Sequence, residues 1–185
     1  MYHWKSIVRF GLPLLTLCIF IEIFVGQLLQ QKNDFLLKQL PIFLVSIPVI
    51  NSVGGNIGSI LGAHLASGLH VGSIRLDIKD KTMRETLVTS LLMGAITYCS
   101  LSIGIYLLGI FTGVNMDIHF FTFAMILLST GFVLICLLSI ISVFTAFISF
   151  KKGLDPDDVV SPVVTTVGDS LGIVLLFFFI GVVGL

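Results

Sequence analysis

The sequence predicts an all-α integral membrane protein with five transmembrane helices. The chain has 185 residues, of which 56% are hydrophobic and only 11% charged, and its mean hydropathy is +1.12. A bilayer core of roughly 30 Å requires about 20 apolar residues per helix, so a chain of this length accommodates about five spans. Because little chain remains for a soluble domain, we expect a single transmembrane domain over residues 1–185, in a multi-pass protein of the cell membrane.

The five predicted spans differ in character. The apolar runs place them at about residues 7–29, 40–68, 85–110, 119–149 and 158–184. The first follows two basic residues, Lys5 and Arg9, as a signal peptide does, but it lacks a clear small-residue cleavage site and is interpreted as a retained helix. It also contains Glu22, which is either an ion-pathway residue or a packing residue. The third and fourth spans are rich in Leu, Ile and Phe and are expected to face lipid or one another.

Basic residues predict the orientation of the chain. Eight of the ten basic residues precede the first span or lie in the second and fourth connections, namely Lys5, Arg9, Arg75, Lys79, Lys81, Arg84, Lys151 and Lys152. The opposite side holds only Lys32 and Lys38. Because basic residues concentrate in cytoplasmic segments, this pattern places the N-terminus in the cytoplasm and the C-terminus outside.

The second span contains the segment PVINSVGGNIGSILGAHLASG, from Pro48 to Gly68. One face of this helix collects small and polar residues, namely Asn51, Gly55, Gly58, Ser59, Gly62 and Ala66, which is typical of a seam where two helices approach closely. Two neighbouring glycines, Gly54 and Gly55, could instead break the helix just before Asn56 and expose carbonyl groups to a cavity. An asparagine amide needs partners inside a membrane, so Asn51 and Asn56 are candidate oxygen donors to an ion.

The fifth helix begins in the segment LDPDDVVSPVVTTVGDSLG. Asp155 is suited to cap the helix and Pro156 to its first position, while Asp157 and Asp158 place negative charge in its first turn. Capping alone would explain Asp155. Three carboxylates at a cytoplasmic mouth would also raise the local cation concentration, so Asp155 and Asp158 are candidates for an ion pathway.

One carboxylate lies deep inside the fifth span. At about 100° per residue, an arc of roughly 100° collects the small and polar residues Ser161, Thr165, Gly168, Asp169 and Gly172. A carboxylate at this depth costs about 2.5–3.5 kcal/mol, so it normally faces a cavity, a partner or an ion. No Lys or Arg lies deep in any span. Asp169 must therefore be protonated, solvated by water or bound to a cation. The aligned oxygens of Ser161 and Thr165 favour water or a cation.

These two segments also carry a family likeness. PVINSVGGNIGSILGAHLASGLHVG and DPDDVVSPVVTTVGDSLG resemble the membrane domain of MgtE-type magnesium transport proteins, and especially one five-helix unit of the animal magnesium solute carriers. The resemblance implies a unit that pairs about a two-fold axis with its fifth helices beside the pore. It implies that Asp169 binds the ion, that Thr165 and Ser161 line the same pathway, and that Asn56 is the asparagine of the second-helix motif.

The resemblance also sets expectations for domains and assembly. Bacterial MgtE proteins carry a cytosolic sensor with paired CBS domains, whereas this chain starts only a few residues before its first span, so we expect no sensor or CBS domain. A single unit without a fused partner is expected to form a homodimer. The glycines of the two motifs, Gly55 and Gly168, are further candidates for the ion pathway.

The predicted function is transport of Mg²⁺, or a related divalent cation, across the lipid bilayer by this homodimer. Mg²⁺ prefers oxygen ligands and is commonly held by one or two carboxylates with retained water. No Cys or His aligns with Asp169, which argues against copper or zinc. The alternatives are a sodium- or proton-coupled exchanger and a non-transporting membrane subunit. The sequence has no Ser/His pair, HExxH motif or second acid aligned with Asp169, so we do not expect an enzyme. We also expect no nucleic-acid partner.

Overall fold

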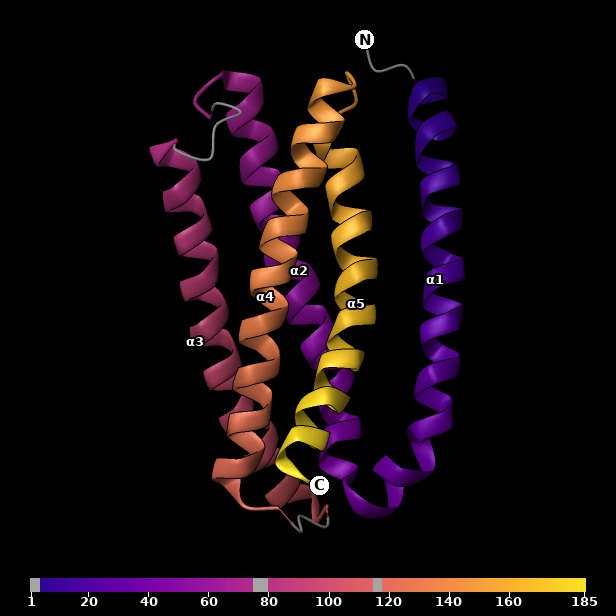
Figure 1. The fold of residues 1–185 in the computed structure, drawn as a ribbon, viewed down its shortest axis with the longest axis vertical. Helices are drawn as coiled ribbons and strands as arrows, with labels where there is room; N and C mark the ends of the chain where they lie inside the picture. Colours follow the sequence, from indigo (N-terminus) through magenta and orange to yellow (C-terminus); the bar gives the residue numbers. More distant parts are fainter. Residues whose placement is uncertain (1–3, 75–79, 115–117) are drawn as a thin grey trace.

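The computed structural model has five long helices, as predicted (Figure 1). It describes residues 4–74, 80–114 and 118–185, without the side chains of residues 4–7, 10, 32–35 and 37–39. The helices are α1 (Trp4–Gln39), α2 (Pro41–Val71), α3 (Lys81–Thr112), α4 (Phe120–Lys151) and α5 (Pro156–Val183). Each contains a stretch long and apolar enough to cross a membrane. The described residues contain no strand, so the predicted all-α class is confirmed.

Local sequence signals set several helix ends. The side chain of Asp80 accepts a hydrogen bond from the backbone N–H of Met83 at 3.0 Å and caps α3. Asp155 caps α5 by accepting from the N–H of Asp157 at 3.1 Å, as the sequence predicts. α2 ends at Gly72, whose φ of 75° lies in the left-handed region that favours glycine.

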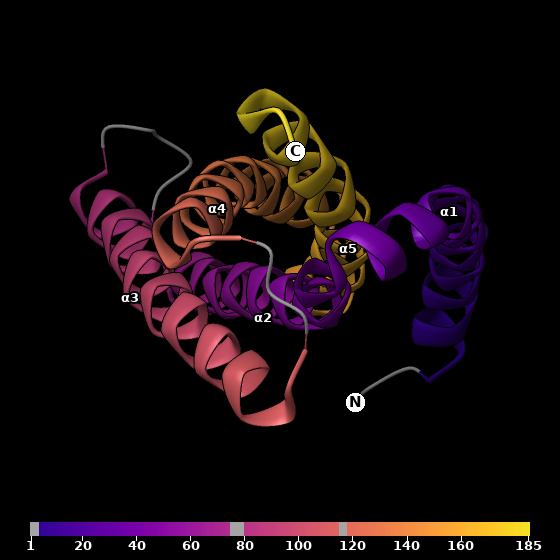
Figure 2. The same ribbon diagram turned by 90° about the horizontal axis from the view of Figure 1, so that it is seen from below.

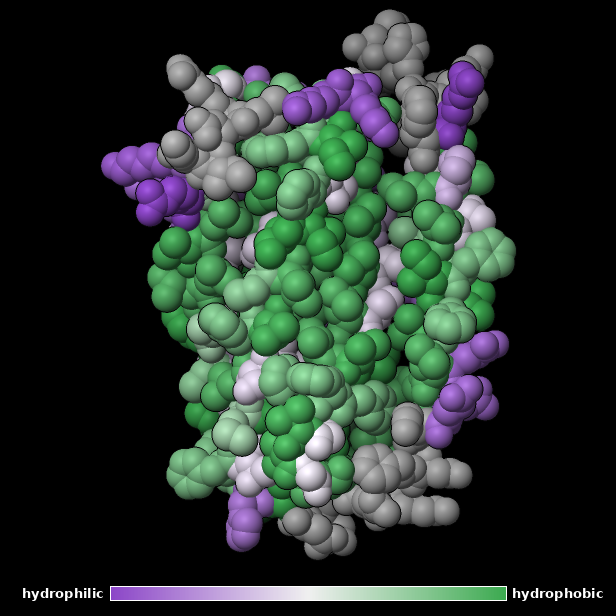
Figure 3. Space-filling model, viewed as in Figure 1, coloured by the Kyte–Doolittle hydropathy of each residue, from purple (hydrophilic) through white to green (hydrophobic). Residues whose placement is uncertain are grey.

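α2 lies at the centre of the bundle and α1 at its edge (Figure 2). α2 and α5 make the most extensive contact of any helix pair, and α4 packs against both. α1 reaches the bundle mainly through α5. Only 6% of the first membrane span is buried, compared with 44% of the second. The surface seen in Figure 3 is apolar over most of its length, as a face in contact with lipid requires.

Leucines of α4 fill the space between α2 and α5. Leu134 packs against Gly54 of α2, and Leu138 lies beside Gly58 of α2 and Gly168 of α5. All are buried, so the core of the bundle lies among these three helices. The hydroxyl of Ser142, also on α4, donates to the backbone carbonyl of Gly58 at 3.1 Å.

The arrangement of helix ends agrees with an odd number of spans. The beginnings of α1, α3 and α5 and the ends of α2 and α4 meet at one end of the bundle, while α5 finishes at the other (Figure 1). Five exposed basic residues belong to the first end, namely Arg9, Lys81, Arg84, Lys151 and Lys152. Two others used to predict orientation, Arg75 and Lys79, lie outside the described residues, as does the side chain of Lys5. The cytoplasmic position of this end stays a prediction.

Candidate functional site

Glycines bring α2 and α5 into close contact. A β-carbon added at Gly55 would lie 3.2 Å from the side-chain methyl of Thr165, and one added at Gly58 or Gly62 would overlap Val164 or Val160. The two helices run antiparallel, so each turn of α2 towards its C-terminus meets an earlier turn of α5. The small-residue seam predicted from the sequence is therefore confirmed at these glycines.

The same close contact explains Gly168 and the continuity of α2. A β-carbon at Gly168 would lie 3.5 Å from the backbone nitrogen of Gly55, so here one backbone packs on the other. The helix break that Gly54 and Gly55 could have made does not occur, because α2 is helical without interruption from Pro41 to Val71. These glycines permit packing against α4 and α5 while the backbone stays hydrogen-bonded within the helix.

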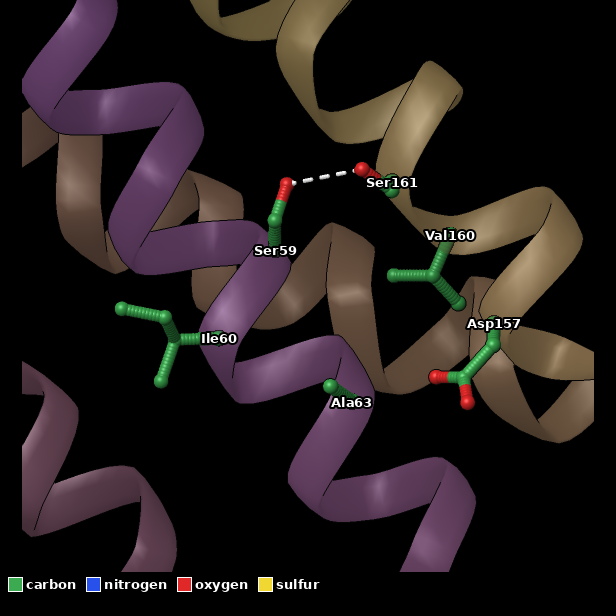
Figure 4. A pocket seen from close by; sticks show the side chains of 6 residues that line it. All are labelled: Ser59, Ile60, Ala63, Asp157, Val160 and Ser161. Carbon is green, nitrogen blue, oxygen red and sulfur yellow. Dashed lines mark hydrogen bonds between the residues drawn. The ribbon is translucent and has the colours of Figure 1, made fainter.

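An open cavity lies between α2 and α5 near the beginning of α5 (Figure 4). Its volume is about 400 Å³, and its lining consists of Ser59, Ile60, Ala63, Asp157, Val160 and Ser161. The hydroxyl oxygens of Ser59 and Ser161 lie 3.1 Å apart and share a hydrogen bond across the two helices. The cavity thus has hydroxyl groups at one boundary and a carboxylate at another.

Asp157 is one of the three carboxylates that the sequence places at the start of the fifth helix, but it is not among the ion-pathway candidates named from the sequence. Its side chain is exposed and lines the cavity, whereas its two acidic neighbours are not among the lining residues. Asp155 is held by its capping bond, and Asp158 is exposed. The three acids differ in whether the side chain faces the cavity beside α2. That orientation depends on how α2 and α5 pack together.

Thr165 and Asp169 follow Ser161 along α5, one and two turns further into the span. The hydroxyl of Thr165 donates to the backbone carbonyl of Ser161 at 2.9 Å. It also lies 3.1 Å from the backbone carbonyl of Pro162. Its oxygen therefore keeps acceptor capacity. Asp169 is half-buried. Among the described residues, no side chain donates a hydrogen bond to its carboxylate.

A second carboxylate approaches α5 from α1. The hydroxyl of Thr166 donates to Oε1 of Glu22 at 3.2 Å. Thr166 itself is only 3% exposed. At about 100° per residue, Asp169 lies on α5 between Thr165, which faces α2, and Thr166, which faces α1. The contact through Thr166 thus brings Glu22 to α5 three residues before Asp169.

The two asparagines of α2 lie in different surroundings. Asn51 packs beside Gly172 of α5, and its Oδ1 atom is buried without a hydrogen-bond partner among the described residues. Asn56 is exposed on the chain surface, where its amide donates to the hydroxyl of Ser52 at 3.4 Å. Asn51 therefore lies in the α2–α5 contact, one turn before Gly55 along α2. Asn56 lies beside that contact.

Within the described part of the chain, no three His, Cys, Asp or Glu side chains converge in a way that could hold a metal ion. The oxygens that the structure places on the same part of α5 as Asp169 are the hydroxyls of Thr165 and Thr166 and, bonded to Thr166, the carboxylate of Glu22. Such a sparse set suits a cation that keeps part of its water shell more than a tightly held structural metal.

Five apolar helices with polar groups along one internal seam define a multi-pass membrane protein. The family model of MgtE, described as a divalent cation transporter, matches residues 47–179, which include most of α2 and nearly all of α5. The chain belongs to this family. No match was found among curated proteins or among solved structures.

Proposed function

We propose that the chain transports Mg²⁺ as a two-fold homodimer, through a pathway lined by α2 and α5 with Asp169 at the ion site. The observation that carries this proposal is the position of Asp169. It lies in the middle of a 28-residue apolar helix. It is close to the hydroxyls of its own helix and to the glycine seam of α2. In a chain of the MgtE family, such an intramembrane carboxylate is a candidate ligand of the transported cation.

The contacts of the described side chains support a cation as the partner of Asp169. The only salt bridge found among them joins Lys81 and Glu85 at 3.7 Å, on the exposed start of α3. A buried or half-buried carboxylate without a basic partner is stabilised by water, by protonation or by a metal ion. The neighbouring hydroxyl oxygens of Thr165 and Ser161 and the amides of Asn51 and Asn56 are the further oxygen donors that we assign to the pathway.

The chemistry of these donors favours Mg²⁺. All of them are hard oxygen ligands, and Mg²⁺ is commonly bound through one or two carboxylates while it keeps several waters. Soft metals would prefer thiolate or imidazole groups. The thiol of Cys18 contacts α5 at the backbone carbonyl of Pro162, 3.8 Å away and seven residues before Asp169.

Exposed polar groups support pairing with a second copy. Ser52 and Asn56 are exposed on α2, and Glu22 is exposed on α1, all within membrane spans. Lipid tails offer no hydrogen-bond partners to such groups, so they are expected to face protein or a water-filled pathway. A two-fold partner placed over this side of α2 and α5 would enclose them, and the two copies of Asp169 would then belong to one pathway.

The cavity beside Ser59 and Ser161 fits the entrance of that pathway. It opens at the end of the bundle where the basic residues place the cytoplasm. Asp157, together with the exposed Asp158 and the capping Asp155, gives this entrance a negative charge that attracts cations. Gly55 and Gly168 act by allowing the two helices to pack closely.

Magnesium uptake into liposomes tests the proposal. Purified wild type, Asp169→Asn and the control Glu85→Gln are reconstituted separately, and a trapped fluorescent indicator reports entry of Mg²⁺. We expect uptake by wild type and by the control, and loss of uptake in Asp169→Asn. Light scattering on each detergent-purified sample checks that the protein is a dimer.

The outcomes separate the candidate functions. Equal uptake by wild type and Asp169→Asn would remove Asp169 from the ion site. No uptake by any variant would favour a non-transporting membrane subunit. Repeating the wild-type measurement with and without a sodium or pH gradient distinguishes a coupled exchanger, whose flux follows the gradient, from a channel, whose flux does not.

A further inference from the structure

We propose that Glu22 of α1 is a second ion-binding carboxylate, which acts together with Asp169 of α5. This inference rests on the proposed function and extends it, because it assigns part of the ion site to a helix outside the two motif-bearing spans. It concerns the same class of ligand, a hard divalent cation bound by oxygen.

The register of α1 against α5 places Glu22 near the level of Asp169 along the bundle. The thiol of Cys18 approaches the carbonyl of Pro162, and one turn further along both helices Glu22 accepts from Thr166. Both pairs are separated by 144 residues in sequence, so the two helices run parallel and stay in step. One further turn in the same register brings the chain to Asp169. Glu22 therefore lies within about one turn of Asp169.

The hydrogen bond from Thr166 orients Glu22 without neutralising it. Thr166 is almost completely buried, so its hydroxyl is a fixed donor between α1 and α5. The bond uses Oε1 of Glu22 and leaves Oε2 as an acceptor. A carboxylate can accept several bonds, so one hydroxyl donor leaves most of its capacity for a cation. A hydroxyl that holds a ligating carboxylate in this way is the usual second layer of a metal site.

Among the side chains that the structure describes, no basic residue forms a salt bridge with Glu22. Glu22 is the only charged residue between Gly11 and Gln31, and the salt bridge found among the described side chains lies elsewhere, at the start of α3. Its neighbour Asp169 has the same charge. Two negatively charged carboxylates close together in an apolar medium repel each other. A divalent cation between them reverses that repulsion, whereas a helix-packing role would be served better by a neutral side chain.

Two carboxylates also explain a preference for divalent over monovalent cations. A site with one carboxylate and neutral oxygens attracts both, but the attraction of a second carboxylate counts twice for a doubly charged ion. Glu22 is thus expected to set selectivity and affinity, while Asp169 remains the residue without which no ion binds.

The test measures Mg²⁺ binding to the full chain in detergent by isothermal titration. The variants are Glu22→Gln, Thr166→Val, Thr166→Ser and Asp169→Asn, with Glu85→Gln as the matched control. We expect Glu22→Gln to weaken Mg²⁺ binding at least about tenfold, and Thr166→Val to weaken it by about tenfold because an orienting hydroxyl is lost. Thr166→Ser keeps the hydroxyl and should bind like wild type, and so should the control.

Competition by Na⁺ provides a second readout that packing alone would not move. Excess Na⁺ should displace Mg²⁺ more readily from Glu22→Gln than from wild type. If Glu22→Gln folds poorly, the contrast between Thr166→Val and Thr166→Ser decides the question, since these differ in the hydroxyl that orients Glu22.

Failure of this inference is distinguishable from failure of the proposed function. Binding by Glu22→Gln at wild-type strength, with binding lost in Asp169→Asn, overturns the role of Glu22 and leaves the Asp169 site intact. Undiminished binding in Asp169→Asn overturns the proposed site, and no Mg²⁺ binding by wild type overturns both.

Discussion

Gly58 of α2 lies directly against Val164 of α5, so closely that a β-carbon at position 58 would overlap the valine side chain. This contact fixes the distance between the two helices that we assign to the pathway. Because Val164 is β-branched and fully buried, it has few alternative rotamers with which to yield.

Gly58→Ala should therefore destabilise the bundle, by about 1–3 kcal/mol as is usual for overpacking. Thermal unfolding in detergent, followed by circular dichroism, measures the effect. Gly104→Ala is the matched control, because a β-carbon there meets no atom within 4 Å and alanine favours the helix. Adding Val164→Ala to Gly58→Ala should restore part of the loss. A Gly58→Ala protein as stable as wild type would show that the two helices can separate freely.

Tyr98 ties α3 to the centre of the bundle. It is 1% exposed, and its hydroxyl donates to the backbone carbonyl of Ile50 at 2.9 Å. We expect Tyr98→Phe to lower stability by about 1 kcal/mol, since one buried hydrogen bond is lost and the ring remains. Tyr106→Phe should cost less, because that hydroxyl has a longer bond of 3.3 Å, to Ile118, in a half-buried position. Equal melting temperatures for Tyr98→Phe and wild type would contradict this account.

A disulfide between positions 59 and 161 should stop transport. The two serine hydroxyl oxygens lie 3.1 Å apart between α2 and α5 at one boundary of the cavity, so the two side chains approach each other as the cysteines of a disulfide must. Ser59→Cys with Ser161→Cys, in a chain whose three native cysteines are replaced by alanine, would hold α2 and α5 together on oxidation. We expect liposome uptake of Mg²⁺ by the double-cysteine protein to fall on oxidation and to recover on reduction, whereas oxidant should not change the uptake of either single-cysteine variant from its own starting level. Peptide mass spectrometry verifies the bond, and full uptake by the oxidised protein would mean that the helices need not move apart here.

Asp157→Asn should weaken uptake at low Mg²⁺ concentration. Asp157 lines the cavity, so its charge concentrates cations at the proposed entrance. The Mg²⁺ concentration for half-maximal uptake should rise about twofold to fivefold, the effect of one exposed charge, with little change in the maximal rate. Screening should abolish the difference at high ionic strength. Asp158→Asn should have a smaller effect, because Asp158 is not among the cavity-lining residues, and the reverse order would move the entrance elsewhere.

Much of this architecture can be predicted from the sequence, because lipid imposes strict rules on composition. Hydropathy locates the five spans, and the spacing of Gly55, Gly58 and Gly62 identifies a seam, since residues on one helix face recur with a fixed period. Asp155 followed by Pro156 predicts the start of α5. The sequence left two possibilities open at Gly54 and Gly55, because glycine permits both a helix break and a close helix contact. Only the packing of the neighbouring Leu134 and Thr165 decides between the two.

The contact between Glu22 and Thr166 could not be predicted in this way. Periodicity reports which residues share a face of one helix, but it does not say which helix lies opposite. Thr166 also falls outside the polar arc that contains Asp169, so its role emerges only when α1 is placed beside it. The same limit explains why Asp157 could not be separated from Asp155 and Asp158.

The distance in sequence between Glu22 and Thr166 has a consequence for biosynthesis. At about 5–20 residues per second, a ribosome needs roughly 7 to 29 seconds to make the 144 residues that separate them. During this interval α1 is already inserted and its carboxylate has no hydrogen-bond donor from α5. The contact between the first and last helices can therefore form only at the end of synthesis, so the carboxylate on the first helix is oriented only after the last helix has been made.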